Sequence, residues 1–246
     1  MPDRPGPLSR WSFRLAIVGA VAVVAAPIAY RVGVPLTPAL LAMPVGVLIS
    51  LVALPLSLTA LFRGRRALGR QHQAVRAAAL SAVFGLGPLV FVLPSLGLPA
   101  IHDITTDTAD PPRFAAIVPL RAGAPNSLDY DGATVGDAQR EAYPELESLV
   151  VGLPPARAVD QAGAVVEDLG WELVAVDPQA GLVEATDATM MFGFKDDIVV
   201  RVRPDGDGAR VDVRSVSRVG VGDLGANAAR VRAFLARLAV RAAAEE

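Results

Sequence analysis

Three long stretches without a charged side chain, all near the N-terminus, constrain this chain more than any other feature. They cover residues 15–30, 32–62 and 77–101, and the first lies between two arginines. A helix that crosses a bilayer needs about 20 largely apolar residues. The sequence therefore predicts an α-helical membrane anchor of three transmembrane helices within residues 1–101.

Two other interpretations of these stretches have less support. The first stretch resembles a secretory signal peptide with small residues at "VVAAP", but two further spans follow and the topology needs no cleavage. Prolines interrupt the spans, as they do in helices that line transport pathways. However, no Asp, Glu, Lys, Arg or His lies inside a span, and such groups usually mark an ion path. We therefore interpret the helices as an anchor.

The arginines predict the orientation. The segment "RGRRALGRQHQAVR" at residues 63–76 holds five arginines and no acid, and the positive-inside rule places such a loop in the cytoplasm. Three spans then put the N-terminus inside and everything after residue 101 outside. We expect a multi-pass protein of the inner (plasma) membrane of the cell, in contact with the lipid bilayer through residues 15–101, with an extracytoplasmic C-terminal domain.

Charge is divided unevenly between the two halves. Residues 1–101 contain nine arginines and one aspartate, whereas residues 102–246 contain 14 basic and 24 acidic side chains, a net charge of −10. This acidity argues against nucleic-acid and anionic-lipid partners, so an envelope protein is the expected partner. The absence of cysteine excludes disulfides, thiol catalysis and thiolate metal sites.

The second half divides into an arm and a compact domain. Residues 102–145 show little periodicity and predict an extracytoplasmic arm or linker, whereas residues 146–246 alternate between strand and helix patterns. Their order predicts an α+β two-layer sandwich, an antiparallel sheet with helices on one face. Strands are expected at residues 146–153, 171–177, 181–187, 197–204 and 209–217, and helices at residues 154–169 and 224–243.

The tetrapeptide "DGDG" at residues 205–208 is interpreted as a hairpin turn. It also resembles the start of a calcium loop, but Ala and Val stand where the fifth and twelfth positions need oxygen ligands. With the turn at these four residues, Val202 lies opposite Val211 on the buried side of the hairpin. On the other side Arg201 lies opposite Asp212, as an ion pair on a surface.

The same register brings polar side chains together at one end of the core. On the buried side Asp196 lies opposite Ser217, Ser215 is next to them, and the inner face of the last helix adds Asn227. A buried carboxylate is costly unless hydrogen bonds satisfy it, and Ser217, Asn227, Arg218 or backbone amides are candidate donors. The corner is either a structural network or a polar pocket for a metal or small ligand. We favour the network, because these groups can satisfy one another.

The stretch "VGVGDLG" has the glycine spacing of a dinucleotide-binding loop, with Gly220, Gly222 and Gly225 between an expected strand and an expected helix. No strand follows that helix, so no βαβ unit can form, and the charge of Asp223 would repel a phosphate. We expect no nucleotide here. The glycines are expected to make a turn, and Asp223 is placed to cap the last helix.

At these residues the sequence resembles the DUF1499 family, a domain of unknown function. The similarity is carried by "IHDITTDTADPPRF", "FGFKDDIVVRV" and "VRSVSRVGVGDLGANAARVRAF", which with the hairpin between them cover most of residues 101–238. Many members carry a cysteine-containing segment that has no counterpart here, and the family supplies no established activity. The resemblance implies that the family's polar positions fall on Asp196, Asp197, Arg214, Ser215, Ser217, Arg218, Asp223, Asn227 and Arg230.

These observations support a hypothesis about function that includes no chemical reaction. Neither histidine is near a candidate serine in sequence, so we assign no catalytic residue and no cofactor. His102 and the aspartates after it fit no metal template, and whether a metal binds elsewhere stays open. We expect an integral membrane protein whose acidic outer domain is a binding or scaffolding module. Divalent-cation or small-ligand binding at the polar corner and an envelope hydrolase with paired carboxylates are the alternatives. The candidate ligand-binding residues are Asp196, Asp197, Arg214, Ser215, Ser217, Arg218, Asp223 and Asn227.

Overall fold

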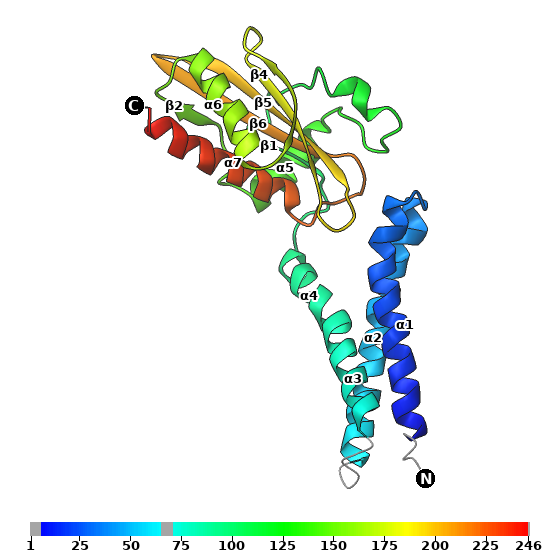
Figure 1. Cartoon of the computed structure of the whole chain (residues 1–246). Coiled ribbons are helices and arrows are strands. Elements are labelled where there is room, and N and C mark those ends of the chain that lie inside the picture. Colours follow the sequence, from blue (N-terminus) through cyan, green and yellow to red (C-terminus); the bar gives the residue numbers. More distant parts are fainter. Residues whose placement is uncertain (1–5, 65–70, 246) are drawn as a thin grey trace. The chain divides into compact units, whose positions relative to one another are not determined.

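The computed structural model describes residues 6–64 and 71–245, which form two compact units. Most helices and strands of both units are labelled in Figure 1. The first unit contains the N-terminal helices through Leu96 together with Met191–Gly193, and the second contains Gly97–Met190 and the chain from Phe194 onward.

The first unit has three helices that are long and apolar enough to cross a membrane. Their mean hydropathy is 2.0, 2.4 and 2.0, which confirms the three apolar helices expected from the sequence. The arginine-rich loop that predicts the orientation falls largely on residues 65–70, outside the described residues. The helices are α1 (Pro7–Arg31), α2 (Leu36–Arg63) and a third built from α3 (His72–Ser81), a π-helical turn (Ala82–Leu86), α4 (Gly87–Val92) and a short 3-10 turn (Leu93–Ser95).

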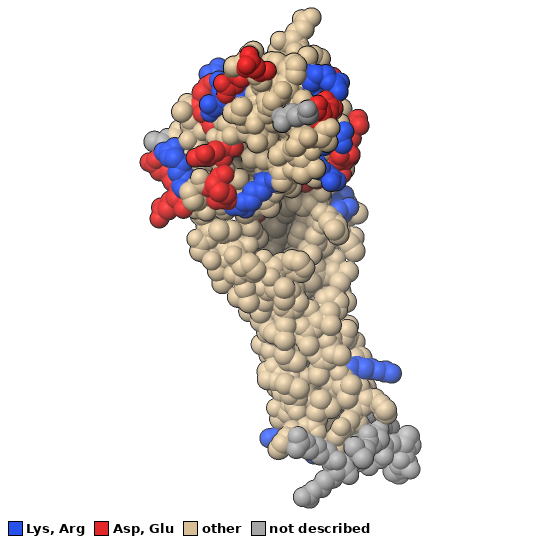
Figure 2. All heavy atoms as spheres, turned by 90° about the vertical axis from the view of Figure 1, so that its left-hand side faces the viewer, with Lys and Arg blue, Asp and Glu red and all other residues tan. Residues whose placement is uncertain are grey.

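Small residues set the packing of α1 against α2. A Cβ atom added to Gly19 would lie 2.8 Å from the carbonyl oxygen of Gly46 and would collide with Ser50. Such glycines let two helix backbones approach closely, which is the usual way apolar helices associate where water provides no driving force. Figure 2 shows the contrast in charge: on the face drawn, acidic and basic side chains gather on the second unit and are nearly absent from the helices.

The second unit is built on an antiparallel six-stranded sheet. The strand order is β1-β6-β5-β4-β3, and β2 pairs with β6 beside β1. The antiparallel sheet was predicted, whereas the short strand β1 was not, because three residues give no readable alternation. The strands are β1 (Asp103–Thr105), β2 (Leu149–Val151), β3 (Glu172–Asp177), β4 (Leu182–Ala188), β5 (Lys195–Asp205) and β6 (Gly208–Ser217).

Helices α6 (Pro155–Asp168) and α7 (Ala226–Ala243) cover one face of this sheet (Figure 1). Their apolar stripes meet the inward side chains of β5 and β6 in a single core, in which Phe234 and Leu238 are fully buried. The ring of Trp171 stacks on Phe234 with centroids 6.0 Å apart. A further helix, α5 (Gly132–Ala142), lies in the region expected to be irregular and packs its apolar residues on the edge of the same core.

The pairing of β5 with β6 follows the predicted register. Val202 lies opposite Val211 and Asp196 lies opposite Ser217. Between these pairs the buried side holds Val200, Val213, Ile198 and Ser215. The turn is tighter than expected, because Asp205 and Gly208 already pair as the last residues of the two strands. The register was predictable because a slip by one residue would move every apolar side chain out of the core.

A second layer covers the opposite face of the sheet, which we call the outer face. Segment 106–131 crosses it with only one short 3-10 turn, Val118–Arg121, and contributes Phe114 and Ile117 to a small apolar cluster with Val199 and Val216. The carboxylate of Glu184 fixes the segment by accepting the backbone N–H groups of three consecutive residues, 115–117, at 2.8–2.9 Å. The central part of the outer face is therefore buried.

The glycines of "VGVGDLG" form the turn between β6 and α7. Gly220 and Gly225 have φ angles of +99° and +84°, a region that side chains with a Cβ rarely adopt. A Cβ on Gly222 would lie 3.1 Å from the Cα of Ala100, so this glycine allows two backbone segments to touch. The carboxylate of Asp223 accepts the backbone N–H groups of Gly225 and Asn227 at 2.8 and 2.7 Å and so caps the helix, as expected.

Candidate functional site

The eight candidate residues divide between the two faces of the sheet. Because side chains alternate along a strand, neighbours such as Asp196 and Asp197 point in opposite directions, and each is buried in its own layer. Asp196, Ser215, Ser217, Asp223 and Asn227 meet on the helix-covered face at the start of α7, whereas Asp197, Arg214 and Arg218 lie on the outer face.

Asn227 is the centre of the first group, which we call the polar corner. The hydroxyl of Ser215 donates to Asn227 Oδ1 at 2.6 Å, and Asn227 Nδ2 donates to Ser217 Oγ at 2.9 Å and to the carbonyl of His102 at 3.1 Å. Asn227 is fully buried. One amide thus links the end of β6, the beginning of α7 and the segment that enters the unit.

Arg230, one turn along α7, completes the corner. Its Nη2 atom donates to Asp196 Oδ2 at 2.9 Å and to Asp187 Oδ2 at 2.8 Å, and its Nη1 atom donates to Asn227 Oδ1 at 2.8 Å. The sequence suggested Arg218 as a donor to Asp196. That was wrong, because Arg218 continues from the strand onto the outer face.

Asp196 is held in an environment that opposes its charge. Burial raises the pKa of this carboxyl above its usual value, although the positive charge of Arg230 and a hydrogen bond from Ser217 act in the other direction. The negative charge of Asp223 adds to the increase. A carboxyl group with a raised pKa and a single arginine partner is typical of functional sites, but also of buried structural networks.

On the outer face Asp197 is surrounded by donors. Arg218 contacts both of its oxygens at 2.8 Å, Arg121 Nη1 donates to Oδ2 at 2.7 Å, and the hydroxyl of Thr186 donates to Oδ1 at 2.7 Å. Burial alone would raise the pKa of Asp197, but the hydrogen bonds from Arg218 and Thr186 and the charge of Arg218 outweigh it, so the pKa is lowered. Asp197 joins segment 106–131 to the sheet through Arg121.

Arg214 lies at the middle of the outer face. It forms a two-fold ion pair with Asp103, with Nε to Oδ1 at 2.9 Å and Nη2 to Oδ2 at 2.7 Å. It also donates to the carbonyls of Pro112 and Leu128 at 3.2 and 2.8 Å. The rings of Phe114 and Tyr130 lie 5.5 and 5.4 Å from its guanidinium carbon, a distance at which aromatic rings attract cations.

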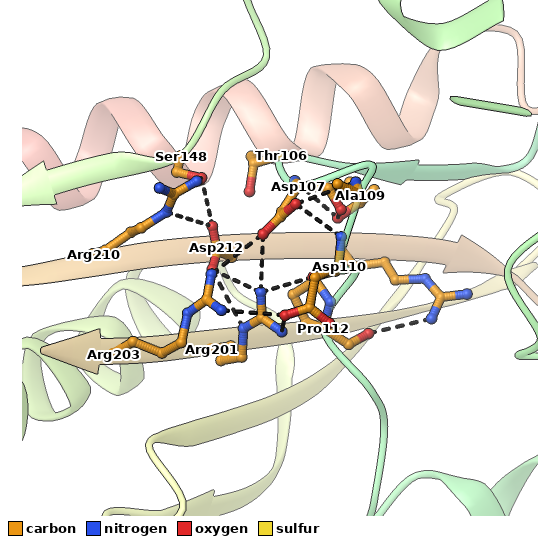
Figure 3. Close-up of polar contacts among 12 residues, drawn as sticks. Thr106, Asp107, Ala109, Asp110, Pro112, Ser148, Arg201, Arg203, Arg210 and Asp212 are labelled. Carbon is orange, nitrogen blue, oxygen red and sulfur yellow. Dashed lines mark hydrogen bonds and ion pairs between the residues drawn. The ribbon is translucent and has the colours of Figure 1, made fainter. Parts of the chain in front are cut away.

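A third charged group surrounds Asp212, and Figure 3 shows its arginines converging on that carboxylate. Nη2 atoms of Arg201 and Arg203 lie 2.9 and 2.8 Å from Asp212 Oδ2, and both arginines also contact Asp107 and Asp110 of the covering segment at 3.0–3.2 Å. The pairing of Arg201 with Asp212 was predicted, but the prediction that this ion pair lies on an exposed surface was wrong. Asp212 is fully buried because segment 106–131 lies over it.

The outer layer was not predicted from the sequence, although the sequence contains a signal for it. Outward positions of β5 and β6 carry arginine and aspartate in similar numbers, and the segment "IHDITTDTADPPRF" supplies the complementary aspartates. Charges of both signs on a single strand face usually indicate a solvated surface, so the covering segment was not anticipated. The residues missed are Asp103, Asp107, Asp110, Arg121, Glu184, Thr186 and Arg203 in the outer layer and Asp187 at the polar corner.

The outer layer leaves one large groove over Arg214. Its volume is about 630 Å³, within the size range of ligand pockets. Apolar side chains form its walls, Arg214 forms part of its floor, and both Arg113 and the acids Asp110 and Asp129 stand at its edge. The lining residues are Ala109, Asp110, Pro111, Arg113, Phe114, Val118, Leu128, Asp129, Tyr130 and Arg214.

Two polar groups at the groove, on Arg214 and Tyr130, have no hydrogen-bond partner among the described residues. A guanidinium has five N–H donors, and the four bonds described above leave one N–H of Arg214 Nη1 without an acceptor among the described residues. The hydroxyl of Tyr130 is buried and has no partner within the same part of the chain. Burial, and next the charge of Asp103, raises the pKa of Tyr130 to about 12, so this hydroxyl stays protonated.

The carboxylates on both faces of the sheet face arginines. Within residues 6–64 and 71–245, no three His, Asp or Glu side chains come together as a metal ion would require. At the polar corner, the oxygens of Asp196, Asp187 and Asn227 face the guanidinium of Arg230.

A comparison with known families identifies the second unit. The model of the DUF1499 family, described as a protein of unknown function, matches residues 103–238, more than half of the chain. The match includes the polar corner, the outer face and the groove, and it confirms the resemblance seen in the sequence. No curated protein matches the chain significantly.

Proposed function

The chain belongs to the DUF1499 family, which has no known activity, and from its site we propose that it is a membrane-anchored binding protein. Three helices anchor it in the bacterial inner membrane, and the acidic C-terminal unit lies outside the cytoplasm. There the groove over Arg214 binds an extended segment of an envelope protein. The single observation that carries this proposal is the groove of about 630 Å³ with an unused donor at its floor.

The chemistry of the groove favours a peptide. A backbone carbonyl is a neutral acceptor suited to the free N–H of Arg214, and an apolar side chain fits against Leu128 and Val118. The acids Asp110 and Asp129 at the edge, and the net negative charge of the unit, favour a basic residue beside that apolar one. The rigid ion pairs beneath the groove hold the floor in place before binding, which reduces the ordering cost of association.

The alternatives have weaker support. Cation or small-ligand binding at the polar corner would have to displace Arg230, which already satisfies Asp196 and Asn227. A hydrolase of the paired-carboxylate kind needs both carboxylates at one reacting centre, whereas Asp196 and Asp197 lie in different layers, each with its own arginine partners.

The proposal is tested by selecting peptides from a random displayed library on the full chain in lipid nanodiscs. We expect selected peptides to combine an apolar residue with Lys or Arg. Their binding should be lost in Leu128→Trp, which fills the groove, and weakened in Asp129→Asn, which removes one exposed acid. Val150→Trp is the control, because Val150 is exposed on β2, outside the groove. Peptides that bind all three variants equally would show that the groove is not the binding site.

A further inference from the structure

Apolar side chains are exposed on three loops at one end of the C-terminal unit. Met190 is 95% exposed, Val221 is 79% exposed, and Leu224 and Leu98 are 62% and 36% exposed. Isolated exposed apolar residues are ordinary, but a group of them marks a surface that meets another apolar phase.

Hydrogen bonds place these loops together. The N–H of Arg218 donates to the carbonyl of Lys195 at 2.9 Å, where the β4–β5 loop returns to the sheet. The N–H of Asp223 donates to the carbonyl of Ile101 at 3.1 Å, where the chain enters the unit. We call residues 97–101, 189–190 and 218–224, all of which belong to the second unit, the apolar loops.

The apolar loops contain a single acid in an otherwise acidic unit. Their sequences are "GLPAI", "TM" and "RVGVGDL", which contain one arginine and one aspartate, whereas residues 102–246 carry 24 acids. The carboxylate of that aspartate, Asp223, accepts two backbone N–H groups at the start of α7. The turns at the opposite end of the strands, "DPQAG" and "PDGDG", contain three aspartates. Charge and hydropathy therefore distinguish one end of the sheet from the other.

The connection to the first unit is short. The third apolar helix ends at Ser95, and Ile101 already belongs to the core of the second unit, so the tether is about six residues long. Residues fully extended span at most about 3.3–3.6 Å each, so Ile101 lies no more than about 20 Å from the end of that helix. The carbonyl of Ile101 accepts the N–H of Asp223 in the loop that carries Val221 and Leu224. An apolar loop surface attached this closely to a proposed membrane helix, with its one acid occupied by hydrogen bonds, is suited to the interfacial region of the lipid.

We propose that the apolar loops form a membrane-contacting surface, on which the C-terminal unit rests against the outer leaflet. The partner is the lipid bilayer, and the contact is made by Met190, Val221, Leu224 and Leu98. This contact would orient the unit with its aspartate-rich turns away from the membrane. The proposal rests on the proposed anchoring of the three helices, but it does not depend on the peptide groove.

The chain has no cysteine, so single cysteines can be labelled without background. We would attach the polarity-sensitive fluorophore NBD to Val221→Cys, Leu48→Cys and Val150→Cys in the full chain. Each would be reconstituted in phosphatidylcholine nanodiscs with and without a spin-labelled lipid that quenches the fluorophore. Leu48 is 62% exposed on α2 and reports the anchor, whereas Val150 is 59% exposed on β2, near the opposite end of the sheet, and is the matched control.

We expect strong quenching at Leu48, and quenching at Val221 that is several-fold greater than at Val150, with a blue-shifted emission. Adding Met190→Asp should reduce the quenching at Val221, because it places a charge in the contact surface. Quenching at Leu48 with Val221 no different from Val150 would overturn the membrane contact and leave the anchor intact. Absence of quenching at Leu48 would overturn the anchor itself, and this proposal with it.

Discussion

Asp196 and Asp197 are adjacent in sequence, but they lie on opposite faces of the sheet and their pKa values shift in opposite directions. Asp196 shares one arginine, Arg230, with a second carboxylate, so burial dominates and raises its pKa. Asp197 has Arg121 and Arg218 to itself, so hydrogen bonds and charge dominate and lower its pKa. The two carboxyls therefore make opposite contributions to stability as pH changes.

We expect Asp197→Asn to lower the free energy of unfolding by about 3 kcal/mol at neutral pH, because it leaves two arginines facing a neutral group in a buried site. The folded-state pKa of Asp197 is lowered, so its stabilising contribution is present above the unfolded-state pKa of about 3.9. That contribution is lost as pH falls through the folded-state pKa. The variant should therefore lose less stability in acid than the wild type.

Urea unfolding of the full chain at several pH values measures this, with the fluorescence of Trp171 as the signal in a Trp11→Phe background. Asp205→Asn, at the exposed hairpin, is the control. Asp196→Asn should change the pH dependence of stability in the opposite direction. The folded-state pKa of Asp196 is raised, so its protonated form adds stability that is lost as pH rises through that pKa. The same pH dependence in the wild type and Asp197→Asn would contradict the assignment.

The second prediction concerns the polar corner. Asn227→Ala should lower the free energy of unfolding by about 2–3 kcal/mol, because it leaves the hydroxyls of Ser215 and Ser217 and part of Arg230 without partners in a buried site. The same urea unfolding measures the change, with Ala229→Ser on the exposed side of α7 as control. Ca²⁺ or a chelator should leave both curves unchanged. A metal that stabilises the wild type but not Asn227→Ala would mean that the corner is a binding site.

The sequence predicted the parts of the fold that depend on short-range periodicity. The β5–β6 register followed from alternating valines around one turn, and that register alone brought Asp196 next to Ser217. The apolar helices followed from length and the absence of charge. Each of these inferences needs only the spacing of residues within one or two elements.

The outer layer depends on contacts that spacing does not determine. Arg121 and Asp197 are 76 positions apart, and Arg214 and Asp103 are 111 positions apart. Segment 106–131 has almost no regular secondary structure to identify it as part of the unit. Only the complementary charges of the segment and the sheet indicate the contact. Charge complementarity alone does not select one arrangement, because the same arginines and aspartates can be paired in many other ways. The family resemblance pointed to Arg230, but the hydrogen bond between Arg230 and Asp196 could be recognised only in the structure.

The third prediction separates two glycines by their backbone conformation. Gly220→Ala should lower the free energy of unfolding by about 1–2 kcal/mol, because its φ of +99° is strained for a residue with a Cβ. The added Cβ itself would make only an ordinary contact, 3.5 Å from the carbonyl oxygen of Gly222. Gly132→Ala should raise it by about 0.4–1 kcal/mol, since this glycine opens α5, has no atom near its would-be Cβ and needs no positive φ. Thermal unfolding of both variants measures the pair. Equal shifts in the same direction would contradict the conformational argument.

The last prediction concerns the hydroxyl of Tyr130 beneath the groove. It is buried with no partner among the described residues, so Tyr130→Phe removes an unsatisfied polar group and little apolar contact. The free energy of unfolding should stay unchanged or rise by up to about 1 kcal/mol. Because the pKa of Tyr130 is raised to about 12, the same substitution should remove the tyrosinate absorbance that appears near that pH in an ultraviolet titration. A loss of more than about 1 kcal/mol would instead show that the hydroxyl has a partner, such as an ordered water in the groove.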